Sequence, residues 1–438
     1  MALATLYADH LREQMRRADV ALERAGFDHL LIPSGVERYG FLDDQTYPFR
    51  PNPHFLSWLP LTQHPSCWIA YTPGQRPVLA YYQPEDYWHV PPAAPSGFWV
   101  EHFDLQVIRS PEEAAQFLPA AARAAIIGED NAAIAGYVPN NPEEALAYLH
   151  YHRARKTPYE LEQLRVASRR GARGHLAAES AFRAGASEHE IHLAFCAAAG
   201  HTDHGLPYAN IVALNEHGAI LHYHHTPAPR PAESRSFLID AGGSEAGYGS
   251  DITRTHARDP GLFADLIGQM DELQQGLVAE VRAGRDYREL HLQCHHRLGG
   301  ILQQSGIVNM SPEAQVERGI TSVFFPHGLG HFLGLQVHDV GGFQRDDRGG
   351  EIPKPAGHPY LRLTRTLEPG HVVTIEPGLY FIPMLLANLR NSADAAQVGW
   401  ALIDTLLPFG GIRIEDDVHV TEGEPENLSR DAFRALAA

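Results

Sequence analysis

Apolar and polar positions along the first 155 residues predict helices and strands in turn. A helical periodicity runs through Leu11–Ala25 and leads to the short apolar run HLLIPSG. Two further apolar runs, CWIAYT from Cys67 and PVLAYYQ from Pro77, are typical of buried strands, and a helical pattern in PEEAAQFLPAAARAA then precedes AIIG. This order predicts a mixed α/β domain over residues 1–155.

The segment Phe41–Pro60 interrupts this pattern because it is rich in aromatic residues and proline. Prolines at positions 48, 51 and 53 exclude a regular helix there. One interpretation is an ordinary surface loop, and the other is a loop that projects toward an active site. The sequence leaves both interpretations open.

A second domain is predicted to begin at Lys156. Thr157 and Glu160 have the spacing of a capping box and Pro158 suits a first helical turn, so a helix is expected to about Arg183. A second capping box, Ser187-Glu188-His189-Glu190, predicts a helix to about Ala199. Strand-like segments follow in the order NIVALN, AILHYHH, SFLIDAG and SDITRTH.

The same order of elements then recurs. One helix is predicted from Asp259 to about Val281, and another begins with a capping box at Asp286 and runs to about Gln304. The segments LGLQVHDV, HVVTIEPGLYF and GIRIEDDVHV are strand-like, and the insert PMLLANLRNSADAAQVGWALIDTL is a short helical excursion. Two helices followed by strands, twice over, predict an α+β domain over residues 156–438 with pseudo-duplicated halves.

Composition narrows the class of protein. The 438-residue chain is 44% hydrophobic and 20% charged, which is typical of a soluble globular protein. Its formal net charge of −18 argues against nucleic-acid and anionic-membrane partners, which favour basic surfaces. The three cysteines form no CxxC pair, and neither a signal peptide nor a membrane-spanning run is apparent, so a cytoplasmic location is expected.

Four short segments combine acidic residues or histidines with glycine. They are LIDAGGSEAGYGSD, HGLGHFLGLQVHD, TIEPG and RIED. Asp240, Glu376 and Glu415 each follow an apolar, strand-like run, where an unpaired carboxylate is costly. Arg413 could pair with Glu415, but the other two have no cation within three positions. Coordination of a metal would remove this cost.

The type of donor also discriminates between metal sites. Two aspartates, two glutamates and one histidine make an oxygen-rich set without sulfur, which suits paired Mn²⁺, Co²⁺ or Zn²⁺ better than a structural zinc ion. Four carboxylates would balance two divalent cations. A water shared by two such ions has a lowered pKa, and the ions polarise a scissile carbonyl group.

Three other kinds of catalytic site fit less well. His327 and His331 have the spacing of the helical zinc motif HExxH, but Gly328 replaces the glutamate and Gly330 also disfavours a helix, so an extended segment is expected. No GxSxG nucleophile elbow is present. The glycine-rich AGGSEAGYGSD lacks the lysine and the following helix of a phosphate-binding loop.

Together these motifs resemble the metallopeptidases of the pita-bread fold, a family that includes methionine aminopeptidases, aminopeptidase P, prolidases and the metal-free creatinases. The resemblance covers about Lys156 to Val420. Over the whole chain, SFLIDAG, NIVALNEH, AILHY and the N-terminal FLDD…YPF…NP segment are most similar to the bacterial prolidases, or Xaa-Pro dipeptidases. The family resemblance implies two divalent metal ions per subunit, with Mn²⁺ favoured over Co²⁺ or Zn²⁺.

The resemblance also implies roles for individual residues. The metal ligands would be Asp240, Asp251, His331, Glu376 and Glu415, with Asp251 and Glu415 bridging the ions. Glu376, His222 and His338 would be catalytic, and the substrate would contact Tyr208, His222, His338 and Arg362. His327 and Arg413 would support the ligands.

These roles imply hydrolysis of Xaa-Pro dipeptides by a metal-bridging hydroxide, with His222 or His338 stabilising the oxyanion and Arg362 binding the proline carboxylate. Aminopeptidase P is the nearest alternative, because it shares the ligands but accepts a longer chain after proline. A side activity on organophosphate triesters and a binding protein without catalysis are the other readings. The resemblance also implies a homodimer.

Overall fold

The computed structural model describes residues 3–437, which form two compact units. The first unit contains the chain up to Glu162 together with Arg345–Gly350, and the second contains the remainder. The sequence places a domain boundary after residue 155, whereas the change of unit comes at Glu162, in the first turns of helix α4 (Pro158–Arg183). No helix within residues 3–437 is both long and apolar enough to cross a membrane.

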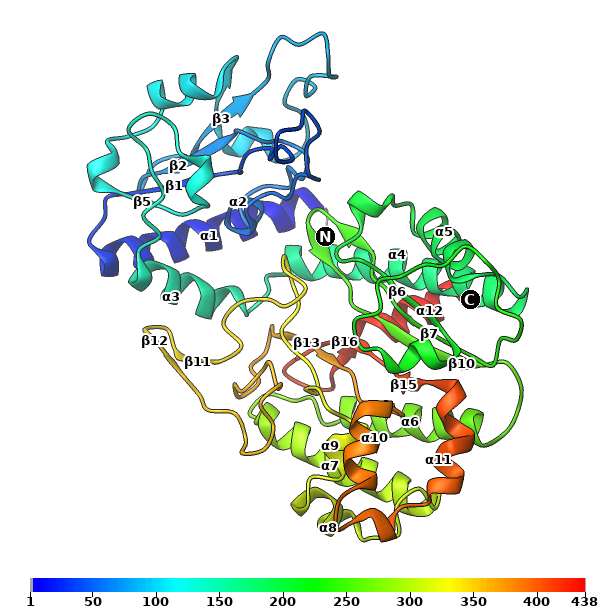
Figure 1. The fold of residues 1–438 in the computed structure, drawn as a ribbon. Coiled ribbons are helices and arrows are strands. Elements are labelled where there is room, and N and C mark those ends of the chain that lie inside the picture. The colour runs from blue at the N-terminus through cyan, green and yellow to red at the C-terminus, as the bar shows by residue number, and fades with distance from the viewer. Residues whose placement is uncertain (1–2, 438) are drawn as a thin grey trace. The chain divides into compact units, whose positions relative to one another are not determined.

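The first unit is built on a five-stranded mixed sheet of order β4-β3-β2-β1-β5 (Figure 1). Strand β1 pairs antiparallel with β2 and parallel with β5, and its apolar run is buried. Helices α1 and α3 pack together through Ala21, Ala145 and Tyr148. The elements are β1 (His29–Pro33), β2 (Trp68–Tyr71), β3 (Val78–Tyr82), β4 (Asp104–Ile108), β5 (Ala124–Ile126), α1 (Leu3–Ala25), α2 (Pro53–Leu56) and α3 (Glu143–Arg153).

Three expectations for this unit need correction. Helix α1 begins at Leu3, well before the predicted start. The helix predicted in PEEAAQFLPAAARAA is instead two 3₁₀ segments, Pro111–Gln116 and Ala121–Arg123, because Pro119 lacks an N–H and disfavours helix in the residue before it. Within the proline-rich segment, Pro53 begins the short helix α2, since proline is tolerated in a first helical turn.

The second unit contains two larger antiparallel sheets; along the described residues two helices precede the first sheet and four precede the second (Figure 1). The first sheet has the order β10-β7-β6 and the second β13-β16-β17, while β14 pairs with β15. An isolated β-bridge pairs Thr253 of the first half with Glu415 of the second. The longer strands are β6 (Ile211–Leu214), β7 (Ser236–Asp240), β10 (Thr253–Ala257), β13 (Val372–Ile375), β14 (Gly378–Tyr380), β15 (Gly411–Arg413) and β16 (Asp416–His419).

The first four helices of this unit and those of the PMLLANLRNSADAAQVGWALIDTL insert agree with the sequence pattern, whereas the helices Pro312–Glu317, Thr321–Phe324 and Leu428–Ala437 have no counterpart in it. Two of the three predicted capping boxes form: the Thr157 N–H donates to Glu160, and Ser187 exchanges hydrogen bonds with Glu190. At the third, the Asp286 carboxylate accepts from the Arg288 N–H, so Asp286 caps the helix without the predicted exchange with Glu289. Such caps stabilise a helix by about 1 kcal/mol each. The helices are α4, α5 (Glu188–Ala199), α6 (Leu262–Val278), α7 (Tyr287–Gln304), α8 (Pro312–Glu317), α9 (Thr321–Phe324), α10 (Pro383–Arg390), α11 (Trp400–Leu406) and α12 (Leu428–Ala437).

The remaining strands are short. They are β8 (Ser244–Glu245), β9 (Tyr248–Gly249), β11 (Gln344–Asp346), β12 (Gly349–Glu351) and β17 (Glu426–Asn427). Two segments expected to be strands, AILHYHH and LGLQVHDV, are irregular. The first begins at the end of a 3₁₀ turn, Asn215–Ala219, and contributes Ile220, Leu221 and His222 to a cavity wall, whereas the second contributes His338.

Candidate metal centre and its cavity

Four carboxylates, buried at Asp251 and Glu415 and half-buried at Asp240 and Glu376, converge from both halves of the second unit. Asp240 ends β7, and Asp251 lies two residues before β10, which pairs with β7. Glu376 follows β13, and Glu415 lies between β15 and β16. The Thr253–Glu415 bridge brings the second half against the first, and the Thr253 hydroxyl donates to Glu415 at 2.7 Å. The structure therefore brings together carboxylates that the sequence separates widely.

His331 completes this group. Its backbone N–H donates to the Thr374 hydroxyl, and its Nδ1 lies 2.9 Å from the Phe332 carbonyl oxygen, which can only accept. Nε2 is thereby directed toward the acidic residues, at 3.4 Å from Asp251 and 3.6 Å from Glu376. One donor atom from each of Asp251, His331 and Glu415 lies within 4.8 Å of the other two. The segment around His331 is not helical, as predicted.

Tyr208 reveals how closely the carboxylates approach. Its hydroxyl is 2.8 Å from an oxygen of Asp240 and 2.6 Å from an oxygen of Asp251. Because a phenol has one hydrogen, it cannot donate fully to both carboxylates at once. A cation between the carboxylates, or a proton on one of them, is needed to relieve the remaining contact between negative oxygens.

The pKa values indicate the same need for positive charge. Burial, followed by the charges of Asp251 and Glu376, holds the pKa of Glu415 well above its usual range. Burial is also the main cause that raises the pKa of Glu376 to about 7 and raises that of Asp240. Burial is also the largest cause at Asp251 and acts in the same direction, but the hydrogen bond and charge of His331 and the hydrogen bond of Tyr208 together outweigh it and lower that pKa. This oxygen-rich set with one imidazole fits two divalent cations.

A series of hydrogen bonds through Arg413, Tyr380 and His327 holds the Asp240 carboxylate in place. Arg413 donates to Asp240 at 2.7 Å and to the Tyr380 hydroxyl at 2.8 Å, and Tyr380 lies 2.8 Å from His327 Nε2. The other nitrogen of His327 contacts the Gly328 carbonyl, so the proton must lie on Nδ1 and Tyr380 donates to Nε2. Arg413 thus pairs with Asp240 rather than with Glu415, correcting the sequence-based pairing.

Tyr380 and Thr253 were not identified from the sequence. Tyr380 holds both Arg413 and His327, and Thr253 holds Glu415. Neither has a local signal, because each acts on partners far along the chain. Their positions on strands beside the motif residues are the one hint that the sequence offers.

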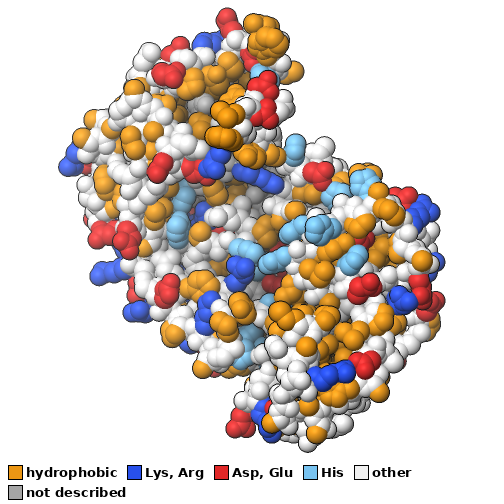
Figure 2. All heavy atoms as spheres, viewed as in Figure 1, with side chains coloured by type: hydrophobic (Ala, Val, Ile, Leu, Met, Phe, Trp, Pro, Cys, Tyr) orange, Lys and Arg blue, Asp and Glu red, His pale blue; other side chains and the backbone are white. Residues whose placement is uncertain are grey.

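A cavity of about 860 Å³ opens onto this group. Its lining combines the acidic residues with His222, His338 and Arg362, together with apolar side chains that include Ile220, Ile382 and Met384. The His338 ring stands nearly perpendicular to that of His331, with their centroids 4.4 Å apart. Figure 2 shows histidine and hydrophobic side chains gathered together on the surface of the second unit. The cavity therefore has acidic, cationic and apolar walls.

Gly242, two residues after Asp240, shows how tightly this region is packed. A Cβ at this position would lie 1.9 Å from the Ser250 carbonyl oxygen. We expect Gly242→Ala to lower the free energy of unfolding by about 3 kcal/mol or more in urea titrations of the metal-free protein. Gly268→Ala, in α6 with nothing within 4 Å of the new Cβ, should instead raise it by up to about 1 kcal/mol. Equal stability of Gly242→Ala and wild type would refute the close approach.

Comparisons with known proteins agree with this architecture. Residues 5–151 match the family described as Xaa-Pro dipeptidase, N-terminal domain, and residues 162–422 match metallopeptidase family M24. The Xaa-Pro dipeptidases of Xanthomonas euvesicatoria and Stenotrophomonas maltophilia are 56% and 54% identical, over 99% and 98% of this chain and 98% of each relative.

Solved structures share the fold at lower identity. Aminopeptidase P from E. coli with the inhibitor Pro-Leu is 24% identical with a TM-score of 0.72, covering 96% of this chain and 95% of that one. Proline aminopeptidase P II from Yersinia pestis is 24% identical with a TM-score of 0.71, covering 98% and 99%. These similarities confirm the predicted pita-bread fold and family resemblance. The chain belongs to metallopeptidase family M24, and is thus a hydrolase, with an N-terminal domain of the Xaa-Pro dipeptidase type.

Proposed function

We propose that this protein hydrolyses Xaa-Pro dipeptides to a free amino acid and proline. The observation that carries the proposal is one cavity lined both by the buried acidic group and by the guanidinium of Arg362. A dipeptide needs this combination, because its scissile carbonyl and its free carboxylate are only one residue apart. The similarity to Xaa-Pro dipeptidases over nearly the whole chain supports the same substrate class.

The proposed ligands of two divalent ions are Asp240, Asp251, His331, Glu376 and Glu415. When bound, two such ions lower the pKa of a shared water and polarise a carbonyl group. Mn²⁺ is the proposed native metal, with Co²⁺ and Zn²⁺ as alternatives, because carboxylate oxygens dominate the donor set. Tyr208, Arg413 and Thr253 fix the carboxylates in place through their hydrogen bonds.

The chain itself supplies the proton transfers and the orientation of the substrate. The prolyl nitrogen carries no hydrogen in the imide, so it must gain a proton before it leaves. Glu376, which lines the cavity, is the proposed carboxylate that takes a proton from the attacking water and passes it to this nitrogen as the C–N bond breaks. His222 and His338, on the same cavity lining, are proposed to stabilise charge on the carbonyl oxygen of the Xaa residue.

Arg362 is the proposed determinant of substrate length. A guanidinium recognises a carboxylate through two charge-assisted hydrogen bonds, which a following peptide bond cannot accept in the same way. A dipeptide therefore fits the cavity better than a longer peptide. This distinction separates the proposed dipeptidase from an aminopeptidase P activity.

Release of the free Xaa amino acid decides between these activities, because cleavage of the Xaa–Pro bond frees it from both a dipeptide and a tripeptide. Chelator-treated protein is assayed with an Xaa-Pro dipeptide and the matching Xaa-Pro-Yaa tripeptide, before and after Mn²⁺ is added. Metal-dependent cleavage of the dipeptide alone is expected. Cleavage mainly of the tripeptide would transfer the assignment to aminopeptidase P. Metal binding without cleavage of either peptide would refute both activities.

An organophosphate triesterase side activity is a further proposal. The cavity has apolar walls that can accept ester groups, and two divalent ions would polarise a phosphoryl oxygen as they do a carbonyl oxygen. Release of the leaving group from a chromogenic triester, lost together with proline release on chelation, is the expected result. Triester turnover that survives chelation would refute a shared site.

Assembly and location complete the proposal. The family resemblance supports a homodimer, and the molar mass in solution tests it directly. We also propose a cytoplasmic location. Its support is that all three cysteines are buried free thiols, as is usual in a reducing compartment.

A further inference from the structure

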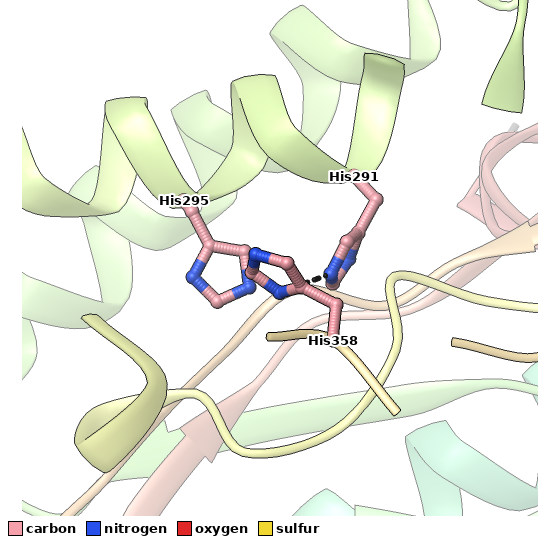
Figure 3. Close-up of side chains that lie close together, drawn as sticks. All are labelled: His291, His295 and His358. Carbon is pink, nitrogen blue, oxygen red and sulfur yellow. Dashed lines mark hydrogen bonds between the residues drawn. The ribbon is translucent and has the colours of Figure 1, made fainter. Parts of the chain in front are cut away.

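A second group of possible metal donors lies in the same unit. His291 and His295 are one turn apart on α7, and His358 approaches them from the loop between β12 and β13 (Figure 3). The ring centroids form a nearly equilateral triangle, with separations of 4.7, 4.6 and 4.5 Å. One donor atom from each residue lies within 4.8 Å of the other two.

The hydrogen bonds of this trio leave two buried nitrogens, His291 Nδ1 and His295 Nε2, without a partner among residues 3–437. His291 Nε2 and His358 Nδ1 are 2.9 Å apart, and His295 Nδ1 is 2.9 Å from the Thr321 hydroxyl. His295 is 1% exposed, yet its Nε2 has no hydrogen-bond partner among residues 3–437. An unsatisfied buried polar atom costs about 1–3 kcal/mol. If His295 Nδ1–H donates to Thr321, Nε2 presents a lone pair, as a metal ligand must.

The trio is also in the protonation state that binds metals. Burial, the largest cause in each case, holds the pKa of His291 well below its usual value, lowers that of His295 to about 3 and lowers that of His358. All three imidazoles are therefore neutral at pH 7, and binding a cation displaces no proton from them.

We propose that His291, His295 and His358 bind one Zn²⁺ ion through their imidazole nitrogens, at a site separate from the acidic centre. Three imidazoles without a carboxylate suit zinc rather than the oxygen-preferring Mn²⁺. Tetrahedral zinc with bonds of 2.0–2.1 Å requires nitrogens about 3.3 Å apart, so the 2.9 Å pair needs only a small separation. Water is the fourth ligand, reaching the site past the half-buried His358.

A zinc ion at this site would hold the loop that carries His358 and Arg362 against helix α7. His358 lies four residues before Arg362, which lines the main cavity, whereas His291 and His295 belong to α7. A zinc ion held by all three would fix the loop against α7. The competing explanation is a purely structural cluster, in which the Phe325 ring packs against His291 and His295 and the trio binds no ion.

Zinc stoichiometry distinguishes these explanations. Full-length protein is freed of metal, equilibrated with micromolar free Zn²⁺ and analysed for zinc per chain. Wild type is expected to hold three ions, and His358→Gln and His295→Asn two each. The matched control His296→Asn changes an exposed histidine on the same helix and should hold three. Equal zinc content in wild type and in both trio variants would overturn the proposal.

A second comparison separates this site from the acidic centre. The double variant Asp251→Asn, Glu415→Gln should keep one zinc ion, which the added His358→Gln change removes. A double variant with no bound zinc would overturn the trio site, whatever the fate of the proposed dipeptidase. If the buried substitution His295→Asn unfolds the protein, the zinc content of His358→Gln still tests the trio site, because His358 is half-buried on a loop and its replacement should be tolerated.

Hydrogen exchange supplies a readout that does not depend on activity. At free zinc ten times the dissociation constant, amide exchange through local opening of residues 355–362 should slow about tenfold in the double variant. The same peptide should not respond to zinc after His358→Gln. Equal zinc effects with and without His358 would overturn the assignment.

Discussion

Glu415→Gln is expected to abolish proline release while leaving the protein folded. The change keeps the shape of the side chain and its contact with Thr253, but removes one of four converging negative charges and a proposed bridging ligand. We expect kcat/KM to fall by about 10⁴-fold or more, which corresponds to about 5.5 kcal/mol of transition-state stabilisation. Metal analysis in Mn²⁺ should find at most one tightly bound ion per chain.

Without metal, the Glu415→Gln variant should be at least as stable to heat as wild type, although it is inactive. Four carboxylates that meet in a buried site repel one another, so the loss of one charge removes a destabilising interaction. Metal-free Glu415→Gln should unfold at an equal or higher temperature than metal-free wild type, whereas added Mn²⁺ should stabilise wild type more. A variant that is stable without metal but gains little stability from Mn²⁺ has lost a metal ligand, whereas a variant with a damaged fold would be less stable in both conditions.

Glu422→Gln is the matched control, because it makes the same chemical change at an exposed position in the same unit. It should retain full activity and metal content. Glu415→Gln with two tightly bound ions and normal turnover would remove Glu415 from the proposed centre. A Glu415→Gln protein that loses metal but keeps its activity would refute the proposed role of metal in the reaction.

The parts of this molecule that could be predicted are those with local physical causes. The capping boxes at Thr157 and Ser187 fix the starts of α4 and α5 through contacts three residues apart. Likewise, the apolar runs before Asp240 and Glu376 predict buried strands, so an acidic residue at their ends signals a site that needs positive charge.

Long-range pairing could not be predicted in the same way. Arg413 lies two residues from Glu415 but donates to Asp240, which is 173 positions away, because the folding of two sheets against each other decides its partner. Similarly, the segments around His222 and His338 have a strand-like sequence but form no strand. Their contacts with distant parts of the fold, which a local pattern does not contain, decide their conformation.

The histidine trio shows a third kind of limit. Glycines exclude a helical pair of metal-binding histidines at His327 and His331, but His291 and His295 form such an i, i+4 pair within α7. A pair of histidines on one helix face is weak evidence alone. The third member, 67 positions beyond His291, becomes visible only when the loop is placed against the helix.

Arg362→Ala is expected to weaken selection of the free carboxylate without disturbing the metal centre. Hydrogen bonds to a charged partner contribute about 1.5–3 kcal/mol, so kcat/KM for an Xaa-Pro dipeptide should fall about 10- to 150-fold, mainly through KM. For the matching Xaa-Pro amide, which has no carboxylate, wild type and variant should be nearly equal. Proline or prolinamide release and metal content are measured on the same preparations.

Lys354 supplies the matched control, because it is the other flexible cation on the same cavity wall. Its ammonium already donates to the Pro359 carbonyl at 2.6 Å and lies 4.9 Å from the centre of the Phe343 ring, so it is less able to bind a substrate carboxylate. Lys354→Met should therefore leave the ratio of dipeptide to amide turnover within about threefold of wild type. If Lys354→Met collapses this ratio and Arg362→Ala does not, carboxylate recognition belongs to Lys354. If neither variant changes the ratio, the preference for dipeptides has another physical origin.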